Sequence, residues 1–230
     1  MGIAVVAGTP FDAGIGARLL RGAGYPATAY PMAGSPDEQD ALQYERPDAL
    51  RAAYLALVRD LGARGHRVAM LFCNSLSAVV DHEAAARVPA VRVISPATVY
   101  REVAAAHRRA LVVTGNGSAV VGYERVTRSA AHSALGVSDP ALVRAVEAGD
   151  PAAAFHASNL PETLRLAGRA RFDAVVLACT HFTAVLPQVL AACPLPVVDV
   201  GSRLVELTAA AADAAARGGA PGGTPGGRAA

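Results

Sequence analysis

The sequence has 230 residues, enough for one large domain or two small ones, and 53% of them are hydrophobic, which is ample for a core. Its formal net charge of +2 provides no basic stripe of the kind that nucleic-acid binding needs, so no nucleic-acid partner is expected. No apolar stretch approaches the ~18 residues of a membrane span, so no membrane partner is expected either.

Lysine is absent from the sequence, and all 21 basic residues are arginine. Pyridoxal phosphate is held as a Schiff base on a lysine amine, so that chemistry is excluded, as is the lysine-containing phosphate loop of nucleotide-binding enzymes. The sequence also contains no convincing set of metal ligands, so no cofactor and no metal are expected. The first residues read directly into a strand without a charged leader, which predicts a cytoplasmic protein. In that setting the three cysteines are expected to be free thiols.

Short apolar runs alternate along the chain with segments of helical period, which indicates parallel βα units. Strands are predicted at 3–8, 27–31, 67–73, 91–95, 110–115, 173–179 and 196–200. Helices are predicted at 13–23, 47–64, 75–87, 97–107, 117–135, 139–147, 160–169, 181–193 and 202–217. The segment 32–47, rich in proline, glycine, serine and acids, is predicted to be a binding loop. The glycine- and proline-rich segment 218–230 is predicted to be a disordered tail.

The same order of elements occurs twice. In each half a strand is followed, about 65 residues later, by a strand that ends in cysteine. Another strand follows about 20 residues after that cysteine. This spacing predicts an internal duplication with two α/β domains of parallel sheet facing each other. We expect the first domain to comprise 1–97 with the C-terminal helix 202–217, and the second to comprise 98–201, with the active site at their interface.

Two short motifs at the ends of these strands carry the chemistry: Cys73-Asn74-Ser75 and Cys179-Thr180-His181. A thiol is more acidic at a helix N-terminus or beside histidine, and both cysteines would occupy such places. Two opposed thiols, one deprotonated and one protonated, can remove a proton from one face of a carbon and deliver one to the other. That reaction is racemisation, and it needs no cofactor if the carbanion is stabilised.

Other residues could assist these thiols. Asp12 could orient groups near Cys73, or it could act only as a helix N-cap. His181 lies two residues after Cys179 and could tune that thiol. The loop 115–118, Gly-Asn-Gly-Ser, follows a strand and could hold a carboxylate on its backbone N–H groups. A zinc site built from Cys73, Cys179 and His181 is an alternative, although Cys-x-His is a short spacing for two ligands of one metal.

These motifs together resemble those of the cofactor-independent aspartate/glutamate racemase superfamily, and in particular those of glutamate racemases. The resemblance covers roughly residues 3–207. It includes Asp12-Ala13-Gly14-Ile15-Gly16, Cys73-Asn74-Ser75, Gly115-Asn116-Gly117-Ser118, Glu147 and Cys179-Thr180-His181-Phe182.

The resemblance implies a two-domain α/β fold with pseudo-twofold symmetry, a small amino-acid substrate at the interface, and a homodimer. Cys73 and Cys179 would form the acid/base pair, assisted by Asp12 and His181, with Glu147 as a further acid. The residues implied to bind substrate are Ala13, Tyr44, Asn74, Ser75, Gly117, Ser118 and Thr180.

The sequence also departs from the family pattern. Ala13 replaces a serine that contacts substrate in glutamate racemases, Ser75 and Ser118 replace threonines, and Tyr44 falls only near the place of another family element. The expected function is racemisation of glutamate, aspartate or a related amino acid. The alternatives are a dicarboxylate isomerase or decarboxylase on the same scaffold, or an amino-acid-binding protein without catalytic activity.

Overall fold

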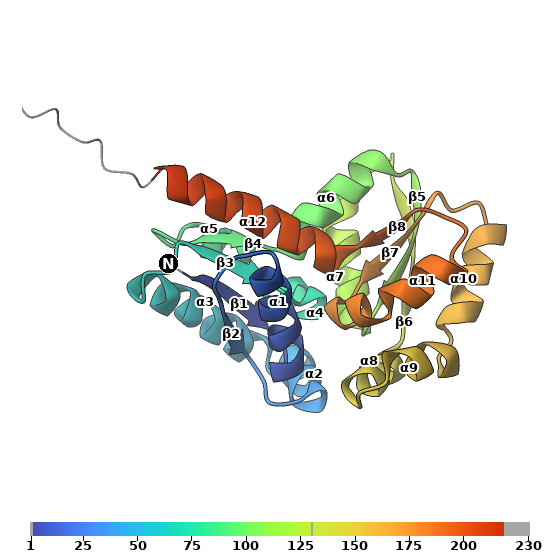
Figure 1. Cartoon of the computed structure of the whole chain (residues 1–230), viewed down its shortest axis with the longest axis horizontal. Coiled ribbons are helices and arrows are strands. Elements are labelled where there is room, and N and C mark those ends of the chain that lie inside the picture. The colour runs from blue at the N-terminus through green and yellow to red at the C-terminus, as the bar shows by residue number, and fades with distance from the viewer. Residues whose placement is uncertain (1, 130, 219–230) are drawn as a thin grey trace, which may run out of the picture.

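The computed structural model describes residues 2–129 and 131–218. It contains two parallel four-stranded sheets, one in each half of the molecule, with helices packed around both (Figure 1). The predicted α/β fold with two related halves is therefore confirmed. The predicted tail lies outside the described residues, except that Gly218 ends the last helix.

The first half contains the strand order β2-β1-β3-β4, and each neighbouring pair is parallel. Its elements are β1 (Ile3–Ala7), α1 (Pro10–Gly22), β2 (Ala27–Pro31), α2 (Pro36–Tyr44), α3 (Pro47–Ala63), β3 (Val68–Leu71), α4 (Asn74–Val79), α5 (His82–Ala86) and β4 (Arg92–Ile94). All seven strands predicted from the sequence are present across the two halves.

The second half has the strand order β6-β5-β7-β8, again parallel, so it repeats the topology of the first half. Its elements are α6 (Pro96–Ala106), β5 (Arg109–Thr114), α7 (Gly117–Thr127), β6 (Ser133–Ser138), α8 (Pro140–Glu147), α9 (Pro151–Ala157), α10 (Leu160–Arg169), β7 (Ala174–Ala178), the 3-10 helix η1 (Thr180–Val185), α11 (Leu186–Ala192), β8 (Val197–Asp199) and α12 (Val200–Gly218).

Helix α12 returns to the first half, along which it lies in Figure 1 (red). Val200, Leu204 and Ala211 pack into the same hydrophobic core as the first sheet. This is where the sequence analysis placed the C-terminal helix. The domain boundaries themselves stay a prediction.

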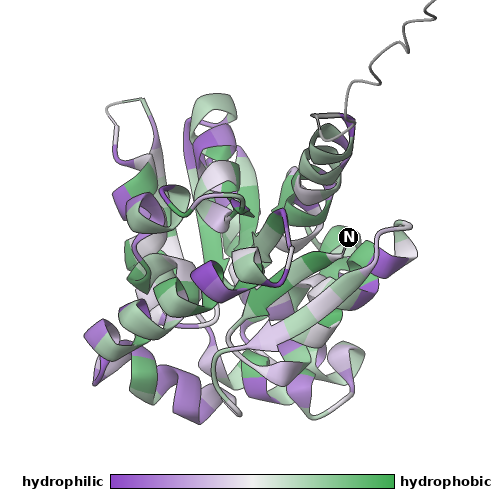
Figure 2. Cartoon of the chain, turned by 90° about the vertical axis from the view of Figure 1, so that its left-hand side faces the viewer, coloured by the Kyte–Doolittle hydropathy of each residue, from purple (hydrophilic) through white to green (hydrophobic). Residues whose placement is uncertain are grey.

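The second sheet lies between two hydrophobic cores. Along β5, Ala110 and Val112 belong to the core shared with the first half, whereas Leu111 and Val113 belong to a second core on the other face. Successive side chains of a strand point to opposite faces, so an uninterrupted apolar run is what a strand covered on both sides requires. Figure 2 shows interior strands in the green of hydrophobic residues, whereas the outer helices carry both green and the purple of hydrophilic residues.

The prediction of a loop over 32–47 is wrong, because this segment contains helix α2. Ser35 caps the helix by accepting a hydrogen bond from the backbone N–H of Glu38, and Pro36 occupies the first turn. The Glu38 carboxylate in turn accepts a bond from the Gly34 N–H at 2.7 Å. Serine followed three residues later by glutamate is a recognised helix start, so this signal was present in the sequence.

Two other predictions need correction. The helix predicted at 117–135 ends at Thr127, and strand β6 follows, which is an edge strand with too few apolar residues to be recognised as one. Asp12 is not an N-cap: Thr9 caps α1 by accepting from the Asp12 backbone N–H at 3.2 Å. Helix α1 therefore begins earlier than predicted and carries Asp12 in its first turn.

Candidate active site

Cys73 and Cys179 occupy corresponding places in the two halves. Cys73 follows β3 and Cys179 follows β7, and each of these strands is the third of its sheet in chain order. Each cysteine is an extended residue immediately before a helix. Their backbone angles are similar, with φ −163° and ψ 121° at Cys73 and φ −148° and ψ 123° at Cys179. The free N–H groups at a helix start stabilise negative charge, and at Cys73 the backbone N–H of Leu76 acts in this direction, against the larger effect of burial.

Both cysteines line one cavity of about 40 Å³, whose walls come from both halves. The residues singled out from the sequence that line it are Asp12, Cys73, Asn74, Ser75, Cys179, Thr180 and His181. Ala13, Gly117, Ser118 and Tyr44 are not among its lining residues. Ala13 is fully buried, whereas Tyr44 is 56% exposed and its hydroxyl accepts a hydrogen bond from the Ser118 N–H at 3.2 Å.

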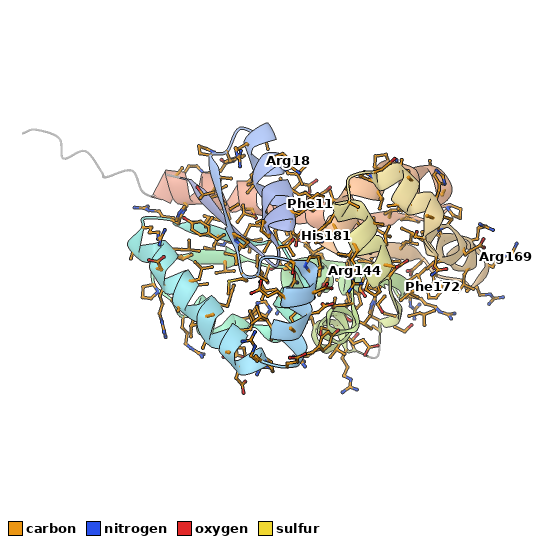
Figure 3. All side chains as sticks on the ribbon, turned by 90° about the horizontal axis from the view of Figure 1, so that it is seen from below. Phe11, Arg18, Arg144, Arg169, Phe172 and His181 are labelled. Atoms are coloured by element: carbon orange, nitrogen blue, oxygen red, sulfur yellow. The ribbon has the colours of Figure 1, made fainter. Side chains whose placement is uncertain are left out.

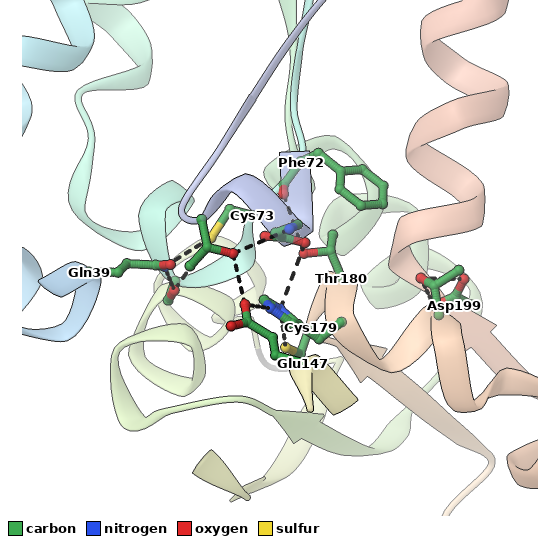
Figure 4. Close-up of polar contacts among 12 residues, drawn as sticks. Gln39, Phe72, Cys73, Glu147, Cys179, Thr180 and Asp199 are labelled. Carbon is green, nitrogen blue, oxygen red and sulfur yellow. Dashed lines mark hydrogen bonds and ion pairs between the residues drawn. The ribbon is translucent and has the colours of Figure 1, made fainter. Parts of the chain in front are cut away.

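His181 is the centre of a polar network that includes Cys179 and Glu147, both labelled in Figure 4. Its Nδ1 lies 3.9 Å from the Cys179 sulfur and 3.7 Å from an Asp12 oxygen. Its Nε2 bonds to the Glu147 carboxylate at 2.8 Å, and the same carboxylate oxygen accepts from the Thr9 hydroxyl at 2.9 Å. The network therefore joins α1, α8 and η1, and Glu147 reaches the site through His181.

The Phe11 ring stacks on the His181 ring, with centroids 5.6 Å apart and an interplanar angle of 15°. Figure 3 shows Phe11, His181 and Arg144 together near the junction of the two halves, with Phe172 and Arg169 at the far end of the second half. The stacked ring covers one face of His181. The contacts of His181 with Cys179, Asp12 and Glu147 are made through its ring nitrogens.

Burial and charge set the protonation of this network. Burial raises the pKa of the Asp12 carboxyl to about 6, although the charge of His181 acts against it. Burial alone would lower the pKa of His181, but the charge of Asp12, with Cys179 and Glu147, holds that pKa well above its usual value. Burial, together with the charge of Asp12, raises the pKa of Cys73 to about 11. Both shifts favour the protonated forms, which are the thiol at Cys73 and the imidazolium at His181.

We expect Asp12→Asn to lower the pKa of His181, because the charge of Asp12 is the largest effect that opposes burial there. Titration of isotope-labelled histidine by NMR measures this value in both proteins. His82, whose pKa is lowered mainly by burial, serves as an internal control and should titrate alike in the two. A His181 titration that does not move would contradict the charge pairing described above.

Helix α2 closes one side of the cavity. Gln39 Nε2 donates to the Cys73 sulfur at 3.2 Å and to the Ser75 hydroxyl at 2.8 Å. Gln43 Nε2 also donates to the Ser75 hydroxyl, at 3.0 Å. The environments of the two thiols therefore differ: an uncharged amide contacts Cys73, and a cationic imidazole contacts Cys179.

Three buried acceptor atoms on lining residues have no hydrogen-bond partner within the described part of the chain. They are both carboxylate oxygens of Asp12 and the Oδ1 atom of Asn74, whose amide nitrogen donates to the Tyr100 hydroxyl at 2.6 Å. Leaving a buried acceptor unpaired costs about 1–3 kcal/mol. Such atoms clustered at one cavity favour a ligand that brings N–H donors.

Three polar lining residues were not singled out from the sequence: Gln39, Asp40 and Arg144. Gln39 and Asp40 lie on α2, whose start signal was present. Asn116 lies within the glycine-containing loop that the sequence analysis identified, but there only the backbone was expected to act. Arg144 had no distinguishing signal, because it is one of many arginines on amphipathic helices.

Across residues 2–129 and 131–218, no three His, Cys, Asp or Glu side chains are grouped as a metal site requires. The zinc site considered from Cys73, Cys179 and His181 is therefore not formed. Within the same ranges, every helix is too short or too polar to traverse a bilayer.

Comparison with known proteins identifies the family. The sequence model described as Asp/Glu/Hydantoin racemase matches residues 16–208. A glutamate racemase from Saccharopolyspora erythraea is 29% identical over 189 residues, which cover 75% of this chain and 66% of that protein. The chain thus spans just under two thirds of the length of this curated relative.

Solved structures show the same fold. Glutamate racemase isoform RacE1 from Bacillus anthracis superposes with a TM-score of 0.69 at 12% identity, covering 93% of this chain and 82% of that one. A glycine-to-cysteine variant of arylmalonate decarboxylase gives a TM-score of 0.62 at 19% identity, covering 98% and 97%. The fold is therefore shared by proteins of different activity, whereas the sequence match over most of its length shows that this chain belongs to the Asp/Glu/hydantoin racemase family.

Proposed function

We propose that this protein interconverts the two enantiomers of an amino acid, with Cys73 and Cys179 as the two acid/base groups. The observation that supports this most directly is the pair of thiols at equivalent strand ends, lining one cavity from opposite halves. A carbon bound between them would have one thiol on each face. That arrangement suits removal of a proton from one side and delivery to the other.

The protons balance as follows. Cys179, as thiolate, takes the α-proton of the bound enantiomer, and the Cα–H electron pair stays on the substrate as a carbanion. The Cys73 thiol then gives its proton to the opposite face, which leaves a thiolate at Cys73 and a thiol at Cys179. The other enantiomer reacts by the reverse sequence. Before a second turnover in the same direction, Cys179 gives one proton to solvent and Cys73 takes one from it, so the starting state is restored with no cofactor and no net gain or loss of protons.

The charges in the site support this starting state. The His181 imidazole, whose pKa is raised, lies 3.9 Å from the Cys179 sulfur and so brings positive charge to that side of the site, whereas burial near Asp12 keeps Cys73 protonated. Glu147 and Thr9 hold the imidazole through its far nitrogen. The cationic ring also stabilises the negative charge that develops on the substrate, an effect that is strong in a site shielded from water.

The unpaired acceptors explain why an amino acid is proposed as the substrate. An ammonium group has three N–H donors, and Asp12 and Asn74 together offer three buried oxygens that accept no hydrogen bond, although one Asp12 oxygen lies 3.7 Å from His181. The α-carboxylate would be held at the helix starts by Asn74, Ser75 and Thr180. Gly117 and Ser118 would complete this set only if their loop moves, since they do not line the cavity.

The alternatives from the sequence differ in an observable way. A dicarboxylate isomerase or decarboxylase needs no ammonium group, so it would leave the acceptors of Asp12 and Asn74 unpaired with its substrate. A non-catalytic amino-acid-binding protein would bind substrate without exchanging the α-proton. A homodimer and a cytoplasmic location form part of the same proposal.

The test is a screen of L- and D-amino acids in deuterated water, with loss of the α-proton signal followed by NMR. We expect at least one amino acid to exchange its α-proton and to yield its enantiomer from either direction. Binding without exchange would support the non-catalytic alternative. Release of carbon dioxide, or turnover only of substrates without an amino group, would support the isomerase or decarboxylase alternatives.

A further inference from the structure

One cation that lines the cavity takes no part in the thiol chemistry. Arg144 comes from α8 and lines the cavity together with Val143 and Pro140 of the same helix. Within the described residues, the only other cationic group in the lining is His181, which is engaged with Asp12 and Glu147. Arg144 is therefore the cationic side chain in the lining that can bind a negatively charged group of the substrate.

The present partner of Arg144 is Asp37. Its guanidinium Nη2 lies 2.9 Å from the Asp37 carboxylate, and the two side chains are 53% and 78% exposed. Exposed ion pairs contribute little to stability, so this one can be exchanged at small cost. The pair also joins the two halves, because Asp37 lies on α2 and Arg144 on α8.

Helix α2 makes further contacts across the cavity, through Asp40 and Gln43. Asn116 Nδ2, at the start of α7, donates to Asp40 at 2.9 Å and to Gln43 at 3.2 Å. With these contacts and those of Gln39 in place, the cavity of about 40 Å³ has room for only about three water molecules. An amino acid therefore needs the α2 side chains to rearrange, and the Asp37–Arg144 pair is an exposed link between α2 and the second half.

We propose that Arg144 determines specificity by binding a carboxylate on the substrate side chain, and that Asp37 takes the place of this carboxylate in the unliganded protein. The proposal rests on the racemase function proposed above. A substrate with an acidic side chain would displace Asp37 from Arg144 and so release α2 from α8. A neutral side chain would gain nothing from Arg144, because the guanidinium would stay with Asp37.

Asp40 offers the competing interpretation. A second acid near Arg144 could instead attract a cationic side chain, so the test must include one. Asp40 already accepts a hydrogen bond from Asn116, whereas the Arg144 partner is the more exposed Asp37. The geometry thus favours exchange at Arg144 over capture of a cation by Asp40.

The experiment compares kcat/KM for aspartate and glutamate with kcat/KM for asparagine, glutamine and lysine. In Arg144→Met we expect the acid-to-amide preference to fall roughly tenfold, as loss of one hydrogen bond to a charged group predicts. Arg144→Lys should restore part of the preference. Asp37→Asn should raise kcat/KM for the acids roughly two- to fivefold, because it removes the competing carboxylate.

Arg165→Met is the matched control. Arg165 is an exposed arginine paired with Glu162 on α10, outside the cavity lining, so its loss should leave the preference as in the wild type. A preference for amides or lysine in the wild type, or an equal loss on acids and amides in Arg144→Met, would overturn the inference while racemisation itself stands. If no amino acid exchanges its α-proton, the proposed function fails along with it.

Discussion

Replacing either Cys73 or Cys179 by alanine is expected to abolish racemisation, with a loss of at least about 10³-fold in kcat/KM. With one thiol gone, a proton can leave one face of the substrate, but none can be delivered to the opposite face. The remaining thiol should still exchange the α-proton of one enantiomer with solvent. Exchange without inversion, followed by NMR in deuterated water and by chiral chromatography, is therefore the expected result in each variant.

The third cysteine provides the matched control. Cys193 is a half-buried free thiol after α11 and does not line the cavity, so Cys193→Ala should keep wild-type activity. The effect of the other two substitutions can then be attributed to position and not to the general loss of a thiol. Two-way racemisation within tenfold of the wild type in either Cys73→Ala or Cys179→Ala would rule out the two-thiol mechanism.

The parts of the site that the sequence predicts well are those fixed by the ends of buried strands. An apolar run followed by cysteine and small polar residues is typical of a buried strand that ends at the carboxyl edge of a parallel sheet, where a helix begins. The runs before Cys73 and Cys179 are buried along their whole length, so their pattern was uninterrupted and easily read. The same strand-end rule places Asn116 after β5.

The parts that were missed depend on which surface a polar helix faces. Helix α2 is short and mostly polar, and only Gln39 and Gln43 on it are buried, so it has no apolar stripe to reveal it. Its inward face contacts Ser75 of the same half and Asn116 of the second half through amides, and the contact with Asn116 exists only after the two halves meet. Arg144 reaches the cavity for the same reason. Contacts between halves are properties of the assembled fold and leave no local signal in the sequence.

The second large loss of activity that we expect comes from replacing Gly115 by alanine. A Cβ atom added at Gly115 would lie 2.9 Å from the Cys179 sulfur and 2.9 Å from a methyl carbon of Val143. Both distances are shorter than the ~3.5–4.0 Å of ordinary contact between such atoms. Because Cys179 and Val143 are both in the cavity wall, Gly115→Ala must push the sulfur or the wall out of place.

We therefore expect Gly115→Ala to lower kcat/KM by roughly 100-fold, since a displacement of about 1 Å at a reacting group can have that effect. The crowding should cost only about 1–3 kcal/mol of stability, which thermal unfolding measures separately. Gly14→Ala is the matched control: Gly14 lies two residues from Asp12, but its new Cβ would meet only the end of the flexible Arg18 side chain, at 3.4 Å. That variant should keep its activity. If Gly115→Ala folded and racemised like the wild type, the position of the Cys179 sulfur would not depend on its close packing against the loop after β5. That packing would then have no part in catalysis.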